Sequence, residues 1–335
     1  MSVKLPPDIL IKYVLSRVGV KDPSVIVGPS IGEDAAVIDL GDGKALVVHV
    51  DPITGAVENI GWLAVHIACN DIAVRGVRPR WVLPVLYLPK GAGVELVDLI
   101  TSQIDLAAKE VNVMVVGGHS EFTPGLNRPL ISMTALGLAE GGRYVRTSGA
   151  RVGDVIIMTK SAGIEGTAIL STDFKDVLSD KGVPEDVLRR GREFIRRVSV
   201  VKEALALAEA GLATSMHDPT EGGVLGGLAE VAYASGKTIE VWEERIPVAE
   251  ETKVIANALG LDPLRLISSG VLLATVSEGK SSKALNTLES LGVNASIIGR
   301  VREYSGYYVV LHRNDGSIEK LTGFFVRDEL SRAWA

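Results

Sequence analysis

Hydrophobic and polar residues along the first 140 positions alternate between strand-like and helix-like spacing. Period-two alternation and short apolar runs predict strands at 35–40, 45–50, 81–88, 111–118 and 130–140. Helical spacing predicts helices at 1–19, about 59–77 and about 94–111. The turn-forming Gly41-Asp42-Gly43 joins the first two strands as a hairpin. This order predicts a mixed sheet with helices on one face.

The second half of the chain alternates helical and strand-like segments after a break rich in Gly, Arg and Ser at residues 140–154. We place a domain boundary near Arg146, which gives domains at 1–145 and 146–335. Helices are predicted after Gly166, from Asp186 to Ala210 and from Glu250, and a hairpin is expected near the C-terminal end. The overall fold class is therefore α/β (α+β), with an α/β second domain.

One predicted helix, at about 59–77, carries polar residues where its apolar stripe should continue. Leu63, Ile67 and Val74 lie on one stripe, but Asn70 and Asp71 stand at its centre, where neither a cap nor a turn explains them. A buried carboxylate without a partner costs several kcal/mol. Either this face of the helix is exposed to solvent or a cationic group lies against Asp71.

Composition is that of a folded, two-domain protein without specialised segments. The chain has 335 residues, of which 47% are hydrophobic and 23% charged, and its formal net charge is −6. The basic cluster at 189–197 is typical of a solvated or interdomain helix face and not of a nucleic-acid site. The single cysteine, Cys69, excludes an internal disulfide and favours a structural reading of that residue. No apolar run reaches the ~20 residues of a membrane span, so we expect a cytoplasmic protein that binds neither membrane nor nucleic acid.

The common nucleotide and nucleophile motifs are absent: the sequence contains no Walker A loop, no Rossmann glycine fingerprint and no nucleophile elbow. Instead, acidic, amide and imidazole side chains gather at predicted element ends. They are Glu33, Asp34, Asp51, Asn70, Asp71, His119, Glu121 and Asp218. Carboxylates without thiolates suit Mg²⁺, which usually completes its shell with water and substrate phosphates, and phosphoryl transfer needs that combination. Apart from Asn70 and Asp71, these motifs taken singly also fit turns or helix starts, and His119 also fits a core histidine.

Five motifs occur in the order typical of one superfamily. They are "GEDAAV" at 32–37, the aspartate at 51, "NDIAVRGVRP" at 70–79, "GGHSE" at 117–121 and "HDPTEGGV" at 217–224. In this the chain resembles the aminoimidazole ribonucleotide (AIR) synthetase superfamily, with the PurM-like fold. Stretches of the second half resemble the hydrogenase maturation branch of that superfamily, HypE.

The resemblance implies a fold and a set of site residues. It implies a homodimer in which the N-terminal sheets pair into a barrel-like core, and ATP between the two domains. Mg²⁺ on the phosphates would be held by Asp34, Asp51, Asp71 and Asp218, of which the last three are the expected catalytic residues. The expected nucleotide-binding positions are Gly32, Glu33, Asp34, Asn70, Gly117, Gly118, His119, Glu121 and Thr220. The segment before Gly32 would form a mobile cover.

The resemblance also implies an activity: ATP-dependent activation of a carbonyl, amide or phosphate oxygen in cofactor or metallocentre biosynthesis. The substrate would be a small molecule or a group on a carrier, and a maturation protein is the expected partner. HypE proteins carry their substrate on a C-terminal cysteine, whereas this chain ends "VRDELSRAWA", so we do not expect the usual carrier. Two alternatives stay open: thiamine-monophosphate kinase or another small-molecule kinase of this fold, and a non-catalytic nucleotide-binding scaffold.

Overall fold

The computed structural model describes residues 5–54 and 58–334, and they divide into two compact units. The N-terminal unit contains Pro23–Gly28 and Asp34–Tyr144. The C-terminal unit contains the described residues up to Asp22, Pro29–Glu33 and those from Val145 onward. The chain thus passes between the units near residue 145, where we expected a boundary, but its first segment groups with the C-terminal unit.

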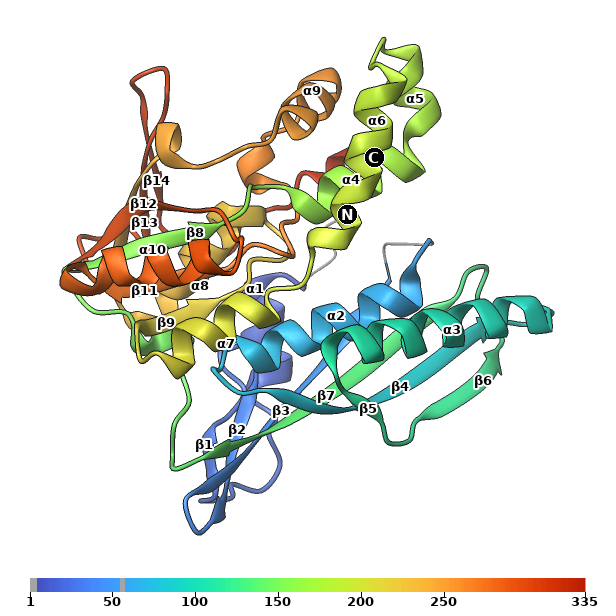
Figure 1. The fold of residues 1–335 in the computed structure, drawn as a ribbon, viewed down its shortest axis with the longest axis horizontal. Helices are drawn as coiled ribbons and strands as arrows, with labels where there is room; N and C mark the ends of the chain where they lie inside the picture. Colours follow the sequence, from blue (N-terminus) through green and yellow to red (C-terminus); the bar gives the residue numbers. More distant parts are fainter. Residues whose placement is uncertain (1–4, 55–57, 335) are drawn as a thin grey trace. The chain divides into compact units, whose positions relative to one another are not determined.

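The N-terminal unit is a mixed sheet with helices on one face. Its elements are β1 Val25–Val27, β2 Ala36–Gly41, β3 Lys44–Ile53, α2 Ile60–Ala73, β4 Pro79–Pro89, α3 Val94–Val111, β5 Met114–Val115, β6 His119–Thr123 and β7 Leu130–Glu140. The strand order is β1-β2-β3-β7-β4-β5, and β6 also pairs with β4. Only β5 and β6 run parallel to β4; the other pairs are antiparallel. Helices α2 and α3 lie side by side along this sheet (Figure 1), which confirms the predicted architecture.

The hairpin between β2 and β3 forms where the turn residues predict it. Gly41, Asp42 and Gly43 all have positive φ, at 80°, 52° and 71°. Such angles are easily adopted by glycine and tolerated by aspartate. These residues therefore allow β2 and β3 to pair directly.

Helix α2 is buried on nearly all sides. A Cβ placed on Gly61 would lie 2.4 Å from the carbonyl oxygen of Ile100 on α3, so the two helices approach closely at a residue without a side chain. Cys69 is fully buried in this helix, and its burial, together with the nearby Asp71, raises the pKa of the thiol. The structural reading of this cysteine is confirmed.

Several expectations for the N-terminal half were wrong in detail. Asp51 does not follow the second strand but lies within β3, because that strand pairs with β7 as far as Ile53. The short strands β1 and β6 were not predicted. The first helix spans only Pro7–Leu15 among the described residues, as α1 Pro7–Ile9 and the π-helix η1 Leu10–Leu15, and residues 1–4 lie outside the described range.

The C-terminal unit is a second mixed sheet, in the order β14-β13-β10-β12-β8-β11-β9, with helices between its strands. Its strands are β8 Asp154–Thr159, β9 Ala213–His217, β10 Thr238–Trp242, β11 Leu273–Ser277, β12 Ala295–Arg302, β13 Val309–His312 and β14 Ile318–Leu321. Its longer helices are α4 Ile164–Asp173, α5 Lys175–Asp180, α6 Glu185–Arg192, α7 Val201–Glu209, α8 Gly223–Ser235, α9 Glu250–Leu259, α10 Ser281–Ser290 and α11 Leu330–Ala333. Short 3₁₀ segments are η2 Thr147–Gly149, η3 Glu193–Arg197, η4 Glu243–Arg245, η5 Pro263–Arg265 and η6 Glu278–Lys280. The predicted α/β domain and its final hairpin, β13–β14, are confirmed.

The helical stretch predicted from Asp186 to Ala210 is divided into α6, η3 and α7. Val198 and Val200 are fully buried at the break, so the chain turns to place both in the core. The arginines of this stretch are largely ion-paired: Arg190 contacts Asp186 and Glu251. This pairing is typical of a solvated helix face.

Over residues 5–54 and 58–334, no helix combines the length and the apolar character needed to cross a lipid bilayer.

Candidate functional site

Strand β3 and helix α2 bring three predicted or possible metal ligands together in the N-terminal unit. Positions 45, 47, 49, 51 and 53 share one face of β3, and the apolar members of this set are buried. This face lies under α2, on which Asp71 is 7% exposed. His49 Nε2 lies 3.5 Å from Asp71 Oδ2 and 3.9 Å from Asp51 Oδ1. Asp51 and Asp71 are therefore brought together as predicted, with His49 between them.

The donor set of this cluster fits a divalent cation. One ligand atom from each of His49, Asp51 and Asp71 lies within 4.8 Å of the others. Ligands of an octahedral ion with bonds near 2.1 Å lie roughly 3 to 4 Å apart, so small side-chain movements would bring these three atoms to coordination distance of one ion. Two carboxylates suit Mg²⁺ or Mn²⁺, and an imidazole nitrogen adds affinity for transition metals. Asn70, adjacent to Asp71, is fully buried in α2.

His49 should affect which metal the cluster prefers. We expect His49→Asn to weaken Mn²⁺ binding by about tenfold and Mg²⁺ binding by less, because Mg²⁺ gains little from a nitrogen ligand. Mn²⁺ electron paramagnetic resonance, with Mg²⁺ as competitor, measures both affinities. The control is His312→Asn, on β13 of the C-terminal unit. An unchanged Mn²⁺ affinity in His49→Asn would show that His49 is not a ligand.

Asp34, a predicted metal ligand, forms a buried ion pair in the N-terminal unit. Arg75 Nη2 donates to Asp34 Oδ2 at 2.7 Å, and the Arg75 side chain is fully buried. Arg75 follows α2, one helical turn after Asp71. The pair therefore ties the residue that precedes β2 to the C-terminal end of α2.

Gly32 and Glu33 have structural partners within the C-terminal unit. Glu33 accepts hydrogen bonds from the backbone N–H groups of Thr147 and Ser148, at 3.2 and 3.1 Å, and from the Ser148 hydroxyl at 2.6 Å. Gly32 has a φ of +82°, and a Cβ there would lie 2.9 Å from the Glu230 carbonyl oxygen. These contacts account for a glycine and a glutamate here on structural grounds.

The "GGHSE" motif lies at another part of the N-terminal sheet. His119 and Glu121 are on β6, with His119 Nε2 3.3 Å from a Glu121 oxygen. The Thr123 hydroxyl and His119 hold the pKa of Glu121 below its usual value. Since β7 and β4 separate β3 from β6, three inter-strand steps of ~4.8 Å place this motif about 14 Å from Asp51. The structure does not bring Gly117, Gly118, His119 and Glu121 next to Asp51.

Asp218 and Thr220 lie in the loop between β9 and α8 of the C-terminal unit. Asp218 is 2% exposed, and the Thr220 carbonyl accepts hydrogen bonds from the N–H groups of Gly223 and Ser268. The preceding residue, His217, contacts Glu230 at 2.9 Å between Nε2 and Oε2. The backbone hydrogen bonds at Thr220 therefore hold the loop that carries this buried carboxylate.

His49 and Arg75 were not expected at the site, although the sequence carries a signal for each. His49 shares a strand face with Val47 and Asp51, so period-two counting places it beside the predicted ligand. Arg75 follows Asp71 by four residues, so helical periodicity over the predicted helix at about 59–77 places the two on one side of it. In both cases the polar residue interrupts a segment that should be buried.

Comparison with known sequences gives the same family for both halves of the chain. Residues 32–139 match the AIR synthase related protein, N-terminal domain, and residues 151–312 match the C-terminal domain of that family. A protein described as a hydrogenase expression/formation protein of Methanocaldococcus jannaschii is 30% identical over 318 residues, covering 91% of this chain and 90% of that protein. Carbamoyl dehydratase HypE of Rhizobium leguminosarum bv. viciae is 28% identical over 295 residues, covering 83% of this chain and 79% of that protein.

Solved structures share the two-domain fold. The structure of a HypE–HypF complex matches with a TM-score of 0.71 and 26% identity, covering 86% of this chain and 92% of the matched chain. A hydrogenase maturation protein HypE in complex with ATP matches with a TM-score of 0.72 and 24% identity, covering 96% and 95%. These matches confirm the predicted mixed α/β fold with two domains.

Proposed function

Because the chain belongs to the AIR synthase related family, we propose that it is an ATP- and Mg²⁺-dependent enzyme that activates a carbonyl, amide or phosphate oxygen by phosphoryl transfer. Its role would lie in cofactor or metallocentre biosynthesis. A relative named as a carbamoyl dehydratase and a similar fold in complex with ATP support this proposal.

The observation that carries the proposal is the cluster of His49, Asp51 and Asp71. These side chains project from a central strand and a buried helix, two rigid elements that hold ligand atoms in place. The cluster would hold Mg²⁺, which neutralises phosphate charge when bound. Asp34 and Asp218 stay predicted ligands from the sequence, and Asp34 would have to share its carboxylate with Arg75.

With a carboxamide as acceptor, the proposed reaction converts the amide and ATP into a nitrile, ADP and phosphate. The amide oxygen attacks the γ-phosphorus, a new P–O bond forms, and the bond from the γ-phosphorus to the bridging oxygen breaks to release ADP. The C–O bond then breaks and releases phosphate, while the nitrogen loses its two protons to solvent and a nitrile remains. Phosphorylation converts an oxygen that leaves poorly into one that leaves readily, and positioning with charge neutralisation supplies most of the catalysis.

Assembly with other chains is part of the proposal. The face of the N-terminal sheet that α2 and α3 leave open carries partly exposed apolar residues, with Leu46 and Val48 on β3 and Leu136 and Leu138 on β7. Val50 on the same face is 55% exposed. An apolar sheet face of this kind fits the homodimer that the resemblance implies. The HypE–HypF complex supports a maturation-protein partner.

The test is a screen for acceptors that stimulate ADP release. We expect slow Mg²⁺-dependent ATP hydrolysis by the protein alone, and a rise of at least about tenfold with a carbamoyl or carboxamide compound. Thiamine monophosphate and selenide are the comparison acceptors, and EDTA should abolish the activity. ADP release measured by a coupled assay gives all of these rates.

The outcomes separate the alternatives. Stimulation by thiamine monophosphate alone would replace the proposal with a small-molecule kinase. Mg²⁺-dependent ATP binding without hydrolysis under any acceptor would favour the non-catalytic scaffold. Absence of ATP binding would exclude the proposed enzyme and both of these alternatives.

A further inference from the structure

The loop at 218–223 is packed closely between two backbone segments of the C-terminal unit, one around 264–266 and the other around 326–328. Gly222 and Gly223 have φ values of +82° and +63°. A Cβ on Gly222 would lie 2.6 Å from the Val326 carbonyl oxygen, and one on Gly223 would lie 2.7 Å from the carbonyl oxygens of Leu264 and Leu266. Both glycines are thus required by conformation and by close approach. The segments around 264–266 and 326–328 form two walls against this loop.

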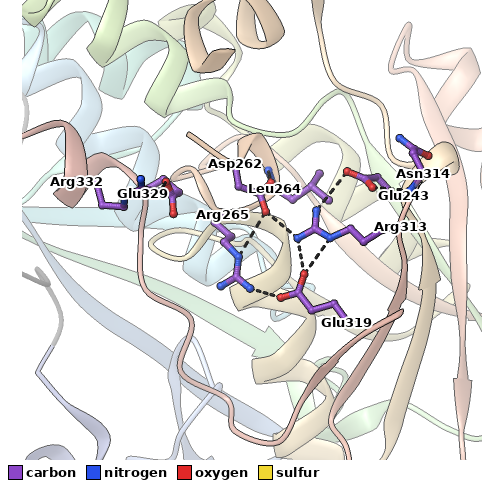
Figure 2. Close-up of polar contacts among 9 residues, drawn as sticks. All are labelled: Glu243, Asp262, Leu264, Arg265, Arg313, Asn314, Glu319, Glu329 and Arg332. Carbon is purple, nitrogen blue, oxygen red and sulfur yellow. Dashed lines mark hydrogen bonds and ion pairs between the residues drawn. The ribbon is translucent and has the colours of Figure 1, made fainter. Parts of the chain in front are cut away.

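The first wall is fixed by a charged network at the C-terminal hairpin. Figure 2 shows Arg313, the residue after β13, directed at Asp262 and Glu319, with Arg265 also paired to Glu319. Arg313 donates from Nη2 to Asp262 Oδ2 at 2.8 Å and from Nε to Glu319 Oε2 at 2.9 Å. Asp262 in turn accepts a hydrogen bond from the Leu264 N–H at 3.0 Å. The hairpin therefore holds residues 262–266 in place.

The second wall is centred on Asp328, which is 5% exposed. Its Oδ2 accepts a hydrogen bond from the Gly222 N–H at 2.8 Å, and its Oδ1 accepts one from the Leu330 N–H at 2.7 Å. Gly222 is the N-cap position of α8, where backbone N–H groups lack partners within the helix. A carboxylate suits that position because it accepts the hydrogen bond and opposes the positive end of the helix dipole.

The two walls are joined to each other. The Glu329 N–H donates to the Arg265 carbonyl at 3.1 Å, and Arg332 Nη1 donates to Glu329 Oε2 at 2.6 Å. Leu330 belongs to the apolar cluster that contains Leu266. The residues that follow Asp328 are thus anchored to the segment at 264–266.

We propose that Asp328 is a positioning residue, which holds the loop bearing Asp218 and Thr220 in its binding conformation through the Gly222 N–H. This inference rests on the proposed function, which gives Asp218 and Thr220 roles in binding ATP and metal. Asp328 lies outside the motifs of the family resemblance. It acts on the loop through backbone, at a point four residues from Asp218.

The buried environment of Asp328 also predicts that ATP affinity depends on pH. Burial, with Glu221 and Glu329 nearby, raises the pKa of Asp328 to about 7. The other charged groups close by have partners of their own. Arg265 pairs with Glu319, Arg332 pairs with Glu329, and Arg327 donates to the Ser331 hydroxyl. Protonation makes the carboxyl a weaker acceptor for the two N–H groups. ATP affinity should therefore fall as the pH drops from about 8 to about 6, and should do so less in Asp328→Asn.

The test compares Asp328→Ala and Asp328→Asn with the control Asp315→Asn. Asp315 also accepts a backbone hydrogen bond, from Ser317 at 2.8 Å, but at the exposed hairpin turn. We expect Asp328→Ala to weaken Mg²⁺–ATP binding by about tenfold, a loss of ~1.4 kcal/mol, and to speed amide exchange at 222–224. Asp328→Asn, which keeps one acceptor, should lie between that variant and the parent, and it serves alone if Asp328→Ala does not fold.

Three results separate this inference from the proposed function. If the parent fails to bind ATP with Mg²⁺, the proposed function falls, while amide exchange still reports whether Asp328 holds the loop. If exchange at 222–224 is unchanged in both Asp328 variants, the positioning role is wrong. If exchange rises but ATP binding and its pH dependence match those of the parent, Asp328 stabilises the fold without serving the site.

Discussion

Asp71→Asn is expected to lower the rate of Mg²⁺-dependent ATP turnover by about 100-fold or more. The change removes one negative charge from the cluster of His49, Asp51 and Asp71 while it keeps the size of the side chain. A factor of 100 corresponds to ~2.7 kcal/mol of lost transition-state stabilisation, which is within the range for removing one electrostatic contact from a site. Because Asp71 is nearly buried, water cannot easily replace its charge.

Steady-state ADP release across a range of Mg²⁺ concentrations measures this effect. The variant should need more Mg²⁺ for half-maximal rate as well as reaching a lower maximum. Asp105→Asn is the matched control, since Asp105 is an exposed helical aspartate of the same unit, paired with Lys109 on α3. Turnover within threefold of the parent in Asp71→Asn would exclude Asp71 from the site.

Arg75→Met is expected to reduce the free energy of unfolding of the N-terminal unit by about 3 to 5 kcal/mol. Removing one partner of a buried ion pair is strongly destabilising, and here it takes away the guanidinium that lies 2.7 Å from the buried Asp34 carboxylate. Both side chains are buried, so screening by solvent does little to reduce the effect. The melting temperature should fall by roughly 12 to 20 °C.

Urea denaturation followed by circular dichroism measures this loss. The double variant Arg75→Met with Asp34→Asn should recover part of the stability, because it also removes the buried negative charge that Arg75 balances. Arg80→Met provides the control: Arg80 is exposed and stacks on the Trp81 ring, 4.4 Å from its centroid. A loss below 1 kcal/mol in Arg75→Met would show that the pair contributes little to the fold.

The sequence predicted the parts of the fold that rest on strong local signals. Helix α3 was expected at about 94–111 and spans Val94–Val111, because its apolar spacing runs unbroken from Gly93 to the left-handed Asn112. The turn at 41–43 was fixed by residues that tolerate positive φ. Short exposed strands escaped prediction: β6, "HSEFT", is mostly exposed and gains its strand conformation from pairing with β4. Such pairing depends on residues distant in the sequence.

The carboxylates of the candidate site could be predicted from the sequence, but most of the residues that contact them or hold their loops could not. Asp71 stood out because it interrupted a buried helix, and β3 does bring Asp51 and His49 to it. That Arg75 pairs with Asp34, 41 residues earlier, and that Asp328 reaches Gly222, 106 residues earlier, are tertiary contacts without a local signal. Counting residue spacing along each element would have found His49, since strand periodicity alone places it between Val47 and Asp51 on one face.

Calorimetric titration of the protein with ATP, with and without Mg²⁺, measures whether this chain binds the nucleotide together with the metal. We expect binding in the micromolar to millimolar range with Mg²⁺, at least about tenfold weaker binding in EDTA, and loss of the Mg²⁺ effect in Asp71→Asn. ATP binding that is absent, or equally strong with Mg²⁺ and with EDTA, would contradict the proposed function.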